Sequence, residues 1–269
     1  MPTIKVNDID MYYEIYGEGE PLLLIAGLGS DLSGWYQLTP GLSAGYRVIA
    51  FDNRGIGRTD KPDKPYSMEM MCDDINGLMG SLGIEKAHIF GVSMGGMIGQ
   101  NFGLLYPERI ASLMLGCTRP GGSHSIPEQD DTRAQLNPEL IESLTPEERA
   151  KNMLPVIFPQ EFIDSNPDFI RDHIRRILDN PIDPVGYARQ IAAADAHDVY
   201  DRLPQITVPT LVLHGSADRL IPAENGRIIA SRIPGAELVI MEGLGHGFTS
   251  QKPDEVVEIV VDFMKRHPL

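Results

Sequence analysis

"HIFGVSMGGMIGQ", residues His88–Gln100, crowds four glycines around one serine. Glycine weakens both strands and helices, by roughly 0.5–1 kcal/mol relative to alanine. So many glycines between an apolar run and a helical segment therefore require an explanation. A tight strand-to-helix turn supplies it, because Gly91 leaves room for the turning backbone and Gly95 lets the helix fold back on the strand. The five residues from Gly91 to Gly95 fit G-x-S-x-G, the strained turn that exposes a nucleophilic serine at a helix N-terminus. The sequence therefore predicts Ser93 as a nucleophile.

A serine hydroxyl is a poor nucleophile and needs a base, together with a group that orients the base. His246 lies in "LVIMEGLGHGFTSQKP", just past the last apolar run, and Asp218 lies in "LVLHGSADRLIP", just past the run before it. Loops at the carboxyl ends of parallel strands meet at one edge of a sheet, where Ser93 is also expected. The chain order Ser, Asp, His is the order found with this elbow. We expect Ser93, His246 and Asp218 to form a catalytic triad.

The competing histidines and acids have simpler interpretations. His88 and His214 lie in strand-like runs and are expected to pack there, and His267 is near the C-terminus. The loop after "RIASLMLG", another position for a triad acid, contains no carboxylate, which favours Asp218. The remaining candidates are assigned to surface or turn positions, although one of these histidines could touch a substrate: His124, His173, His197, Asp52 and Asp60.

An acyl-transfer site also needs two backbone donors aimed at the oxygen on which negative charge develops. The N–H of Met94, directly after the nucleophile, is one candidate. The loop "AGLGSD" that follows "PLLLI" is expected to supply the other, from Leu28. These two residues are the predicted oxyanion hole.

Short apolar runs bounded by glycine recur along the chain, as is typical of strands buried on both faces of a parallel sheet. An alternating hairpin turns at Asn7-Asp8, and six runs follow: "PLLLIAGLG", "YRVIAFD", "KAHIFG", "RIASLMLG", "PTLVLHG" and "AELVIMEG". Helical periodicity lies between them, with one helix after a Ser67 N-cap and another after Pro253. This alternation predicts an α/β fold with helices on both faces of the sheet.

One long segment breaks the alternation. Residues 119–203 contain no convincing strand, but they contain a capping box at Thr145–Glu148 and helix starts at Asn166-Pro167 and Asp183-Pro184. We interpret residues 119–203 as a helical cap inserted into a core made of residues 1–118 and 204–269.

Composition excludes several classes of function. The formal net charge is -15, which would repel nucleic acid and anionic membranes, and no apolar run is long enough to span a bilayer. The N-terminus has no basic patch followed by an apolar block, so we expect a cytoplasmic protein in which Cys72 and Cys117 are free thiols. The seven histidines show no metal-ligand spacing, so neither a metal site nor a cofactor is predicted.

Four blocks in order, "LLLIAGLG", "DNRGIGRTD", "GVSMGGM" and "LHGSADRLIP…GLGHGF", resemble the α/β-hydrolase family over nearly the whole chain. The resemblance implies a mostly parallel sheet of about eight strands with an inserted cap, a serine nucleophile at Ser93, an acid at Asp218 and a base at His246. One departure is Ala26-Gly27, where many members have His-Gly. A serine at the elbow argues against epoxide hydrolases and haloalkane dehalogenases, because those members of the family have an aspartate at this position.

Within the family, the pattern is similar to small esterases and 3-oxoadipate enol-lactonases, so a carboxylic ester hydrolase is expected. Carbon–carbon bond hydrolases of aromatic degradation are an alternative, but "GLGSDLSGW" lacks their Gly-Pro-Gly element. A second alternative is a cofactor-free haloperoxidase or perhydrolase. A more remote alternative is a non-catalytic receptor for a small molecule.

The substrate is expected to be a small, apolar ester. Trp35, Met97 and Phe158 are the candidate substrate-binding residues, with ordinary core packing as the competing interpretation of each. The negative net charge disfavours anionic substrates such as carboxylated lactones, although a local arginine such as Arg119 could reverse that argument. The oligomeric state is not indicated by the sequence.

Overall fold

The computed structural model describes residues 3–135, 140 and 143–269 of the chain. Eight strands form one sheet in the order β1-β2-β4-β3-β5-β6-β7-β8. The strands are β1 (Thr3–Val6), β2 (Ile9–Tyr16), β3 (Glu20–Ile25), β4 (Tyr46–Phe51), β5 (Ala87–Val92), β6 (Ile110–Gly116), β7 (Thr210–Gly215) and β8 (Glu237–Met241). The pairs β1–β2 and β2–β4 are antiparallel, and every other neighbouring pair in this order is parallel. The predicted α/β class and the predicted strand runs are confirmed.

The predicted hairpin is present and has a physical cause. Val6 pairs with Ile9, which leaves Asn7 and Asp8 as a two-residue turn. Asn7 has a φ of 51°, in the left-handed region that a tight hairpin turn requires and that asparagine tolerates.

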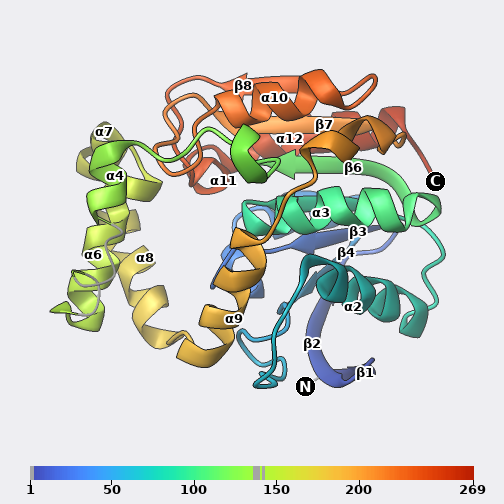
Figure 1. The fold of residues 1–269 in the computed structure, drawn as a ribbon, viewed down its shortest axis with the longest axis horizontal. Coiled ribbons are helices and arrows are strands. Elements are labelled where there is room, and N and C mark those ends of the chain that lie inside the picture. Colours follow the sequence, from blue (N-terminus) through green and yellow to red (C-terminus); the bar gives the residue numbers. More distant parts are fainter. Residues whose placement is uncertain (1–2, 136–139, 141–142) are drawn as a thin grey trace.

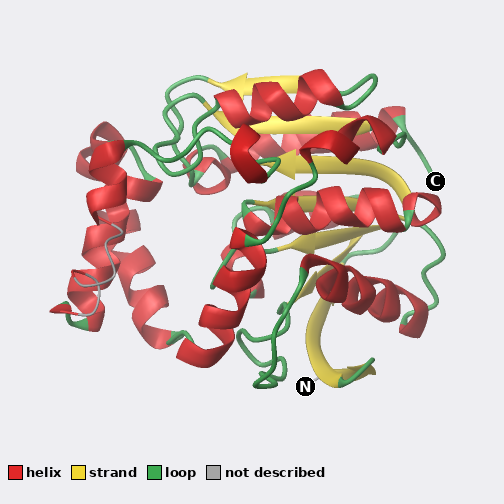
Figure 2. Ribbon diagram, in the orientation of Figure 1, coloured by secondary structure: helices red, strands yellow, loops and turns green. Residues whose placement is uncertain are grey.

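Helices cover both faces of the sheet (Figure 1, Figure 2). One face is covered by α2 (Met68–Ser81), α3 (Met94–Leu105) and α10 (Glu224–Arg232), and the other by α1 (Thr39–Ser43), α11 (Phe248–Gln251) and α12 (Pro253–Arg266). Along β3, Leu23 and Ile25 join the first core cluster while Leu22 and Leu24 join the second. Successive side chains of a strand point to opposite faces, so a strand buried on both faces must be apolar throughout.

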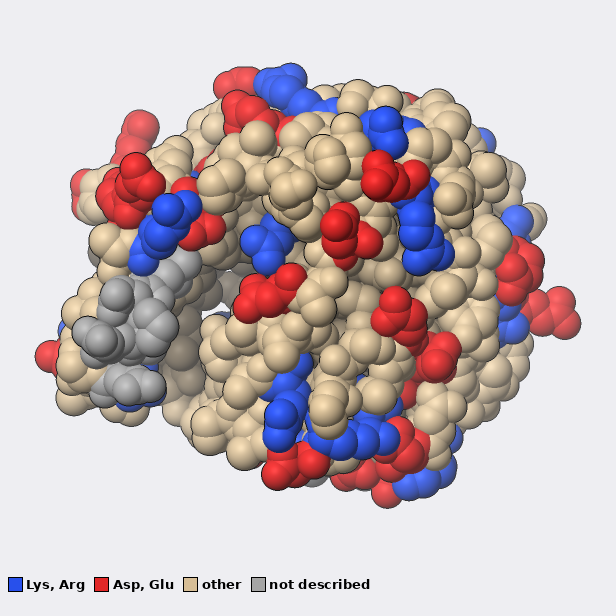
Figure 3. All heavy atoms as spheres, in the orientation of Figure 1, with Lys and Arg blue, Asp and Glu red and all other residues tan. Residues whose placement is uncertain are grey.

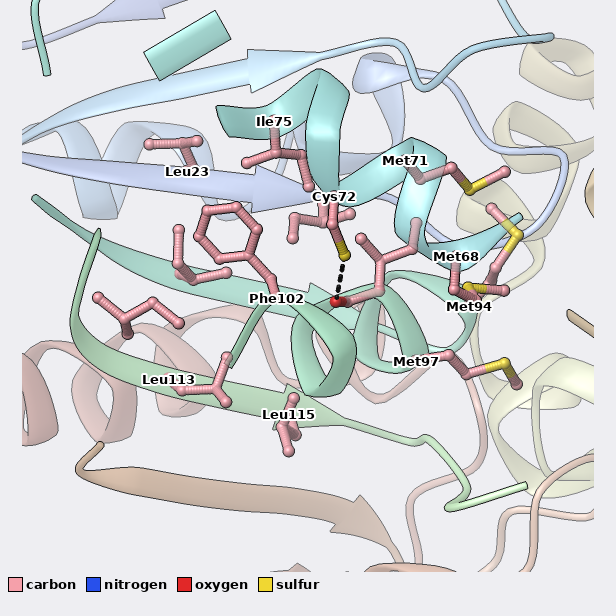
Figure 4. Close-up of a cluster of buried hydrophobic side chains, with 14 of the residues drawn as sticks. Leu23, Met68, Met71, Cys72, Ile75, Met94, Met97, Phe102, Leu113 and Leu115 are labelled. Atoms are coloured by element: carbon pink, nitrogen blue, oxygen red, sulfur yellow. Dashed lines mark hydrogen bonds between the residues drawn. The ribbon is translucent and has the colours of Figure 1, made fainter. Parts of the chain in front are cut away.

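The first core cluster is shown in Figure 4. Met68 and Met71 come from the first turn of α2, and Met94 and Met97 from the first turn of α3, so all four lie at the end of the cluster where the parallel strands finish. Ser67 caps α2 by accepting a hydrogen bond from the Met70 N–H at 3.1 Å, as its position in the sequence predicts. Both helices therefore begin at the carboxyl edge of the sheet.

The segment between β6 and β7 is helical in its described residues. It contains α4 (Asp130–Gln135), α6 (Pro146–Ile157), α7 (Gln160–Ser165), α8 (Pro167–Asp179) and α9 (Pro184–Asp195). Thr145 and Glu148 form the expected capping box at the start of α6. Figure 1 shows α4, α6, α7 and α8 as an outer arm, and α9 returning along the sheet domain.

No helix of the described residues is both long enough and apolar enough to cross a bilayer. On the face drawn in Figure 3, acidic and basic side chains are interspersed, and a hollow separates the outer arm from the sheet domain.

Candidate active site

Ser93 occupies the turn between β5 and α3 in a strained conformation. Its φ of 59° and ψ of -121° are rarely adopted by a residue with a side chain. A Cβ atom on Gly91 would lie 2.1 Å from the Gly95 carbonyl oxygen, and one on Gly95 would lie 2.0 Å from the Ile25 carbonyl oxygen. The two glycines are therefore needed because the backbone passes too close to itself and to β3 for any other residue.

Two hydrogen bonds hold the strained turn. The Ser93 N–H donates to the Gly116 carbonyl at 2.8 Å, and Thr118 Oγ1 donates to the Ser93 carbonyl at 2.8 Å. Gly116 ends β6, the strand next to β5, and Thr118 lies two residues beyond that end. The turn is thus supported by the neighbouring strand, while the Ser93 hydroxyl has no hydrogen-bond partner within the described part of the chain.

The structure brings Asp218 and His246 together. Asp218 follows β7, His246 follows β8, and His246 Nδ1 lies 2.8 Å from Asp218 Oδ2. Asp218 is buried, and the His246 side chain is 12% exposed, so most of the imidazole is covered by protein. Ser93 lies at the same edge of the sheet, at the end of β5 and two strands from β7.

Asp218 is held in its ionised form by its surroundings. Burial opposes ionisation of this carboxyl, but His246 and His214 outweigh burial and bring its pKa well below the usual range. Its second oxygen, Oδ1, accepts hydrogen bonds from the Leu220 and Ile221 N–H groups, both at 2.9 Å. A buried carboxylate with these partners orients the His246 ring with Nδ1 protonated, which leaves Nε2 free to act as a base.

His214 packs in its strand, as expected, and it also contacts the acid. Its Nε2 lies 2.7 Å from the Ile221 carbonyl and 3.5 Å from Asp218 Oδ2. Among the described residues, Cys117, His214 and Asp218 form the one group with possible metal-ligand atoms within 4.8 Å of one another. Burial raises the pKa of the Cys117 thiol well above its ordinary value, which disfavours the thiolate that a metal would need.

The predicted oxyanion loop lies directly beside the elbow. A Cβ atom on Gly27 would lie 3.2 Å from Ser93 Cβ and 3.7 Å from Ser93 Oγ. Leu28 and Met94, the two predicted donors, flank this contact in sequence, and neither N–H donates a hydrogen bond to another described residue. Both N–H groups are therefore without an acceptor among the described residues, as the predicted role in an oxyanion hole requires.

The loop after β4 holds the oxyanion loop. Asn53 Nδ2 donates to the Ala26 carbonyl at 3.0 Å, and Asp52 Oδ1 accepts from the Leu32 N–H at 2.8 Å. Asp52 Oδ2 also accepts from the Arg58 N–H at 2.8 Å, so Asp52 stabilises turns, as the sequence predicts, in its own loop and in the neighbouring one. The sequence offers no signal for the contact with Leu32.

The three predicted substrate-binding residues are all buried. Trp35 packs against Phe90 with ring centroids 5.4 Å apart, and Met97 lies in the core beneath the elbow. Phe158 belongs to the apolar cluster of the outer arm and packs against Gly247, since a Cβ atom on Gly247 would lie 2.4 Å from its ring. Of the three, Phe158 therefore lies next to the loop of His246, and Trp35 lies in the core.

A cavity of about 350 Å³ adjoins the oxyanion loop. It is bounded by the loop from Gly29 to Tyr36, the loop from Ile56 to Arg58, and Ser250 of α11. The second half of α8 and the chain after it close the other side: His173, Arg176, Ile177, Asp179, Asn180, Pro181 and Ile182. None of Trp35, Met97 and Phe158 lines this cavity.

The comparisons with known proteins agree with this architecture. Residues 20–253 match the family model described as alpha/beta hydrolase fold. A Caulobacter vibrioides protein, provisionally named the carbamate hydrolase RutD, is 30% identical over 98% of this chain and 99% of its own. The 2-hydroxy-6-oxo-6-phenylhexa-2,4-dienoate hydrolase of Comamonas testosteroni is 29% identical over 97% of this chain and 93% of its own.

Among solved structures, the enol-lactonase from Burkholderia xenovorans LB400 superimposes with a TM-score of 0.86 and 29% identity, covering 98% of this chain and all of that one. These relatives share a fold and a hydrolytic class while their substrates differ. The chain is a member of the α/β hydrolase family.

Proposed function

We propose that this protein is a serine hydrolase that cleaves small carboxylic esters through an acyl-enzyme. The observation that carries the proposal is the hydrogen bond of 2.8 Å between His246 and the buried Asp218, at the sheet edge where the strained Ser93 also lies. A base oriented by a carboxylate, at the same sheet edge as a serine without a hydrogen-bond partner among the described residues, is what a mechanism that activates a hydroxyl for attack on a carbonyl requires.

The reaction follows from these roles. His246 Nε2 accepts the Ser93 proton as Ser93 Oγ attacks the ester carbonyl, and Asp218 stabilises the imidazolium that forms. The N–H groups of Leu28 and Met94 bind the tetrahedral oxyanion. His246 then protonates the leaving alcohol and activates a water molecule, which releases the acid and frees Ser93.

The segment 119–203 is proposed to be a cap that closes the site. The Gly247 N–H donates to the Ile157 carbonyl at 3.0 Å, so the end of α6 rests on the loop of His246. Arg219, next to the acid, donates to the Pro155 carbonyl at 3.0 Å and pairs with Asp131 of α4. The outer arm thus contacts both loops that carry the proposed base and acid.

The test is hydrolysis of p-nitrophenyl acetate and butyrate by the wild type and by Ser93→Ala. Removal of the nucleophile is expected to lower kcat/KM by about 10⁴-fold or more, because only background catalysis by the oxyanion hole and binding remains. The control is Ser43→Ala, which alters a hydroxyl that donates to the Pro40 carbonyl at 3.3 Å on the exposed surface. Near-full activity of Ser93→Ala would refute the assignment.

The same screen separates the alternatives. Carbamates, ring-fission products of catechols, lactones, and peroxide-dependent perhydrolysis of acetate are compared under identical conditions. Turnover of ring-fission products above that of every ester would favour a carbon–carbon bond hydrolase. Tight binding of small molecules with no turnover of any would favour a receptor.

A second candidate, hydrolysis of esters or lactones that carry a carboxylate, is favoured by the cavity beside the oxyanion loop. Arg176 lines it and forms no ion pair with any described residue, and its guanidinium lies 3.9 Å from the centroid of the Tyr36 ring. His173, one turn earlier on α8, has a buried Nε2 with no hydrogen-bond partner among the described residues. Two acids in the lining, Asp31 and Asp179, oppose an anion. Asp31 also accepts from the Ser33 N–H at 2.9 Å, so Asp179 is the acid to replace in a test.

Matched substrates and matched arginines test this candidate. The probes are mono(p-nitrophenyl) adipate against p-nitrophenyl heptanoate, and p-acetoxybenzoate against p-tolyl acetate. Arg176→Gln is expected to lower the ratio of kcat/KM for anionic over neutral ester by about 10- to 150-fold, since a hydrogen bond to a charged group contributes about 1.5–3 kcal/mol. Asp179→Asn should raise the ratio. Arg175→Gln is the control, because Arg175 pairs with Asp172 at 3.4 Å and does not line the cavity. Equal ratios in all variants would contradict a carboxylate subsite.

A further inference from the structure

Gln190 connects the cap to the oxyanion loop. It lies in α9, and its side chain is completely buried. The Gly29 N–H donates to Gln190 Oε1 at 3.1 Å, and Gln190 Nε2 donates to the Arg54 carbonyl at 2.9 Å. One side-chain amide therefore pairs with a backbone donor of one core loop and a backbone acceptor of another.

The packing around Gln190 shows that α9 is fixed against these two loops. A Cβ atom on Gly186 would lie 1.9 Å from the Gly55 carbonyl oxygen, so the helix backbone touches the loop after β4. Gly29 has a φ of 70°, and a Cβ atom there would lie 2.9 Å from the ring of Tyr187. Helix α9 therefore leaves no room for the oxyanion loop to move toward it.

The contact is adjacent to the proposed chemistry. Gly29 directly follows Leu28, whose N–H is a proposed oxyanion donor, so the Gly29 peptide plane shares the Leu28 carbonyl. Asn53 holds Ala26, on the other side of Leu28. The backbone around Leu28 is thus held on both sides: Asn53 of the core holds Ala26, and Gln190 of the cap holds Gly29.

We propose that Gln190 is a positioning residue for the oxyanion hole, which makes helix α9 of the cap part of the catalytic scaffold. The inference rests on the proposed acyl-transfer function. An oxyanion donor contributes only when it is held where the negative charge develops, and a displacement of about 1 Å can cost 10²-fold in rate. Gln190 acts through the loop and touches no reacting atom.

The experiment compares Gln190→Met with Arg189→Gln. Methionine keeps the length of the side chain and removes both hydrogen bonds. Arg189, the preceding residue of α9, ties the same helix to the core through Asp63 at 2.7 Å on the exposed surface, without contact to the oxyanion loop. Gln190→Met is expected to lower kcat for p-nitrophenyl butyrate by about 10- to 100-fold with KM changed less than about threefold. Arg189→Gln should keep kcat within about twofold of the wild type.

Two further readouts separate positioning from general stability. A trifluoromethyl ketone forms a tetrahedral adduct with serine, and its inhibition constant should rise in Gln190→Met by a factor similar to the loss in kcat. Gln190→Glu should recover activity as the pH falls, because a protonated glutamic acid can donate to the Arg54 carbonyl and accept from Gly29, whereas a carboxylate repels that carbonyl. Its activity is expressed relative to the wild type at each pH.

A lowered melting temperature with kcat and ketone inhibition unchanged in Gln190→Met would overturn the inference. If Ser93→Ala retains activity, the proposed function fails instead, and the two failures are distinguishable because they are read from different variants.

Discussion

Asp218 Oδ2 lies 2.8 Å from His246 Nδ1, and this hydrogen bond joins the loops that follow β7 and β8. The carboxylate is buried and also accepts two backbone N–H groups through Oδ1. Its position is therefore determined by its own loop, and the imidazole is positioned by the carboxylate. Because the imidazole is positioned by the carboxylate, replacing a single atom of Asp218 is expected to change the orientation or the tautomer of His246.

Asp218→Asn is expected to lower kcat for p-nitrophenyl esters by about 10³- to 10⁴-fold, the loss associated with replacing a triad acid. An amide presents N–H to His246 Nδ1 and favours the tautomer in which Nε2 is protonated and no longer a base. Asp60→Asn is the control, since Asp60 is an exposed acid that accepts from the Asp10 N–H at 2.8 Å. Retention of a tenth of the wild-type rate by Asp218→Asn would rule out this role.

Gly95→Ala and Gly80→Ala should change stability in opposite directions. A Cβ atom on Gly95 meets the Ile25 carbonyl oxygen at 2.0 Å, whereas one on Gly80, in the last turns of α2, meets nothing within 4 Å. We expect Gly95→Ala to destabilise the protein by about 3 kcal/mol or more through backbone displacement. Gly80→Ala should stabilise it by about 0.5–1 kcal/mol, from helix propensity alone. Urea unfolding measures both, and a destabilised Gly80→Ala would contradict the helix geometry.

The buried ion pair of Arg54 and Asp74 predicts a large loss on removing one partner. Arg54 Nε lies 2.6 Å from Asp74 Oδ2, and both side chains are at most 2% exposed. Asp74→Leu leaves a buried guanidinium whose one remaining acidic partner among the described residues is the half-exposed Asp8, so the free energy of unfolding should fall by about 3–5 kcal/mol. The comparison is Glu69→Leu, at an exposed position of the same helix, which should change the free energy of unfolding by less than about 0.5 kcal/mol. Similar values for the two variants in urea unfolding would refute the prediction.

His197 should make the protein less stable in mild acid. Burial outweighs the Arg119 carbonyl and lowers the pKa of His197 from 6.5 to about 4. Its Nδ1 accepts from Asn101 at 3.1 Å, so a proton there would face another donor. The folded chain binds fewer protons than the unfolded chain between pH 6.5 and about 4, so stability falls as pH decreases through this window.

The size of this effect follows from the two pKa values. From about pH 7 to about pH 5, the contribution of His197 to unfolding free energy should fall by about 2 kcal/mol. Chemical denaturation at both pH values measures it, and His197→Gln should remove that part of the difference. An unchanged pH dependence in the variant would show that other groups cause it.

Much of the fold follows from local patterns in the sequence. Glycine-bounded apolar runs predict the strands because a strand buried on both faces needs apolar residues throughout, as β3 shows with Leu22 to Leu24. The N-cap Ser67 and the capping box at Thr145 predict helix starts because they satisfy backbone donors within three residues.

The surroundings of the site were not predictable in the same way. Trp35 follows the oxyanion loop closely in the sequence, yet its ring packs against Phe90 in the core. His214 has the pattern of a strand residue, and its distance of 3.5 Å from Asp218 depends on how the following loop folds back. Such contacts depend on side-chain direction and loop path, which the periodicity of a strand does not specify.

By itself, the sequence determined the elbow at Ser93, the succession of strands and helices, and the loops that carry Asp218 and His246, because glycine sterics, hydrophobic period and end caps act over a few neighbouring residues. Only the tertiary structure decided that Gln190 pairs with Gly29, 161 residues away, and that Arg176 and His173 line the cavity beside the oxyanion loop. These juxtapositions depend on how the helices between β6 and β7 dock on the sheet, and docking is set by the packing of complete surfaces, which no short stretch of sequence contains.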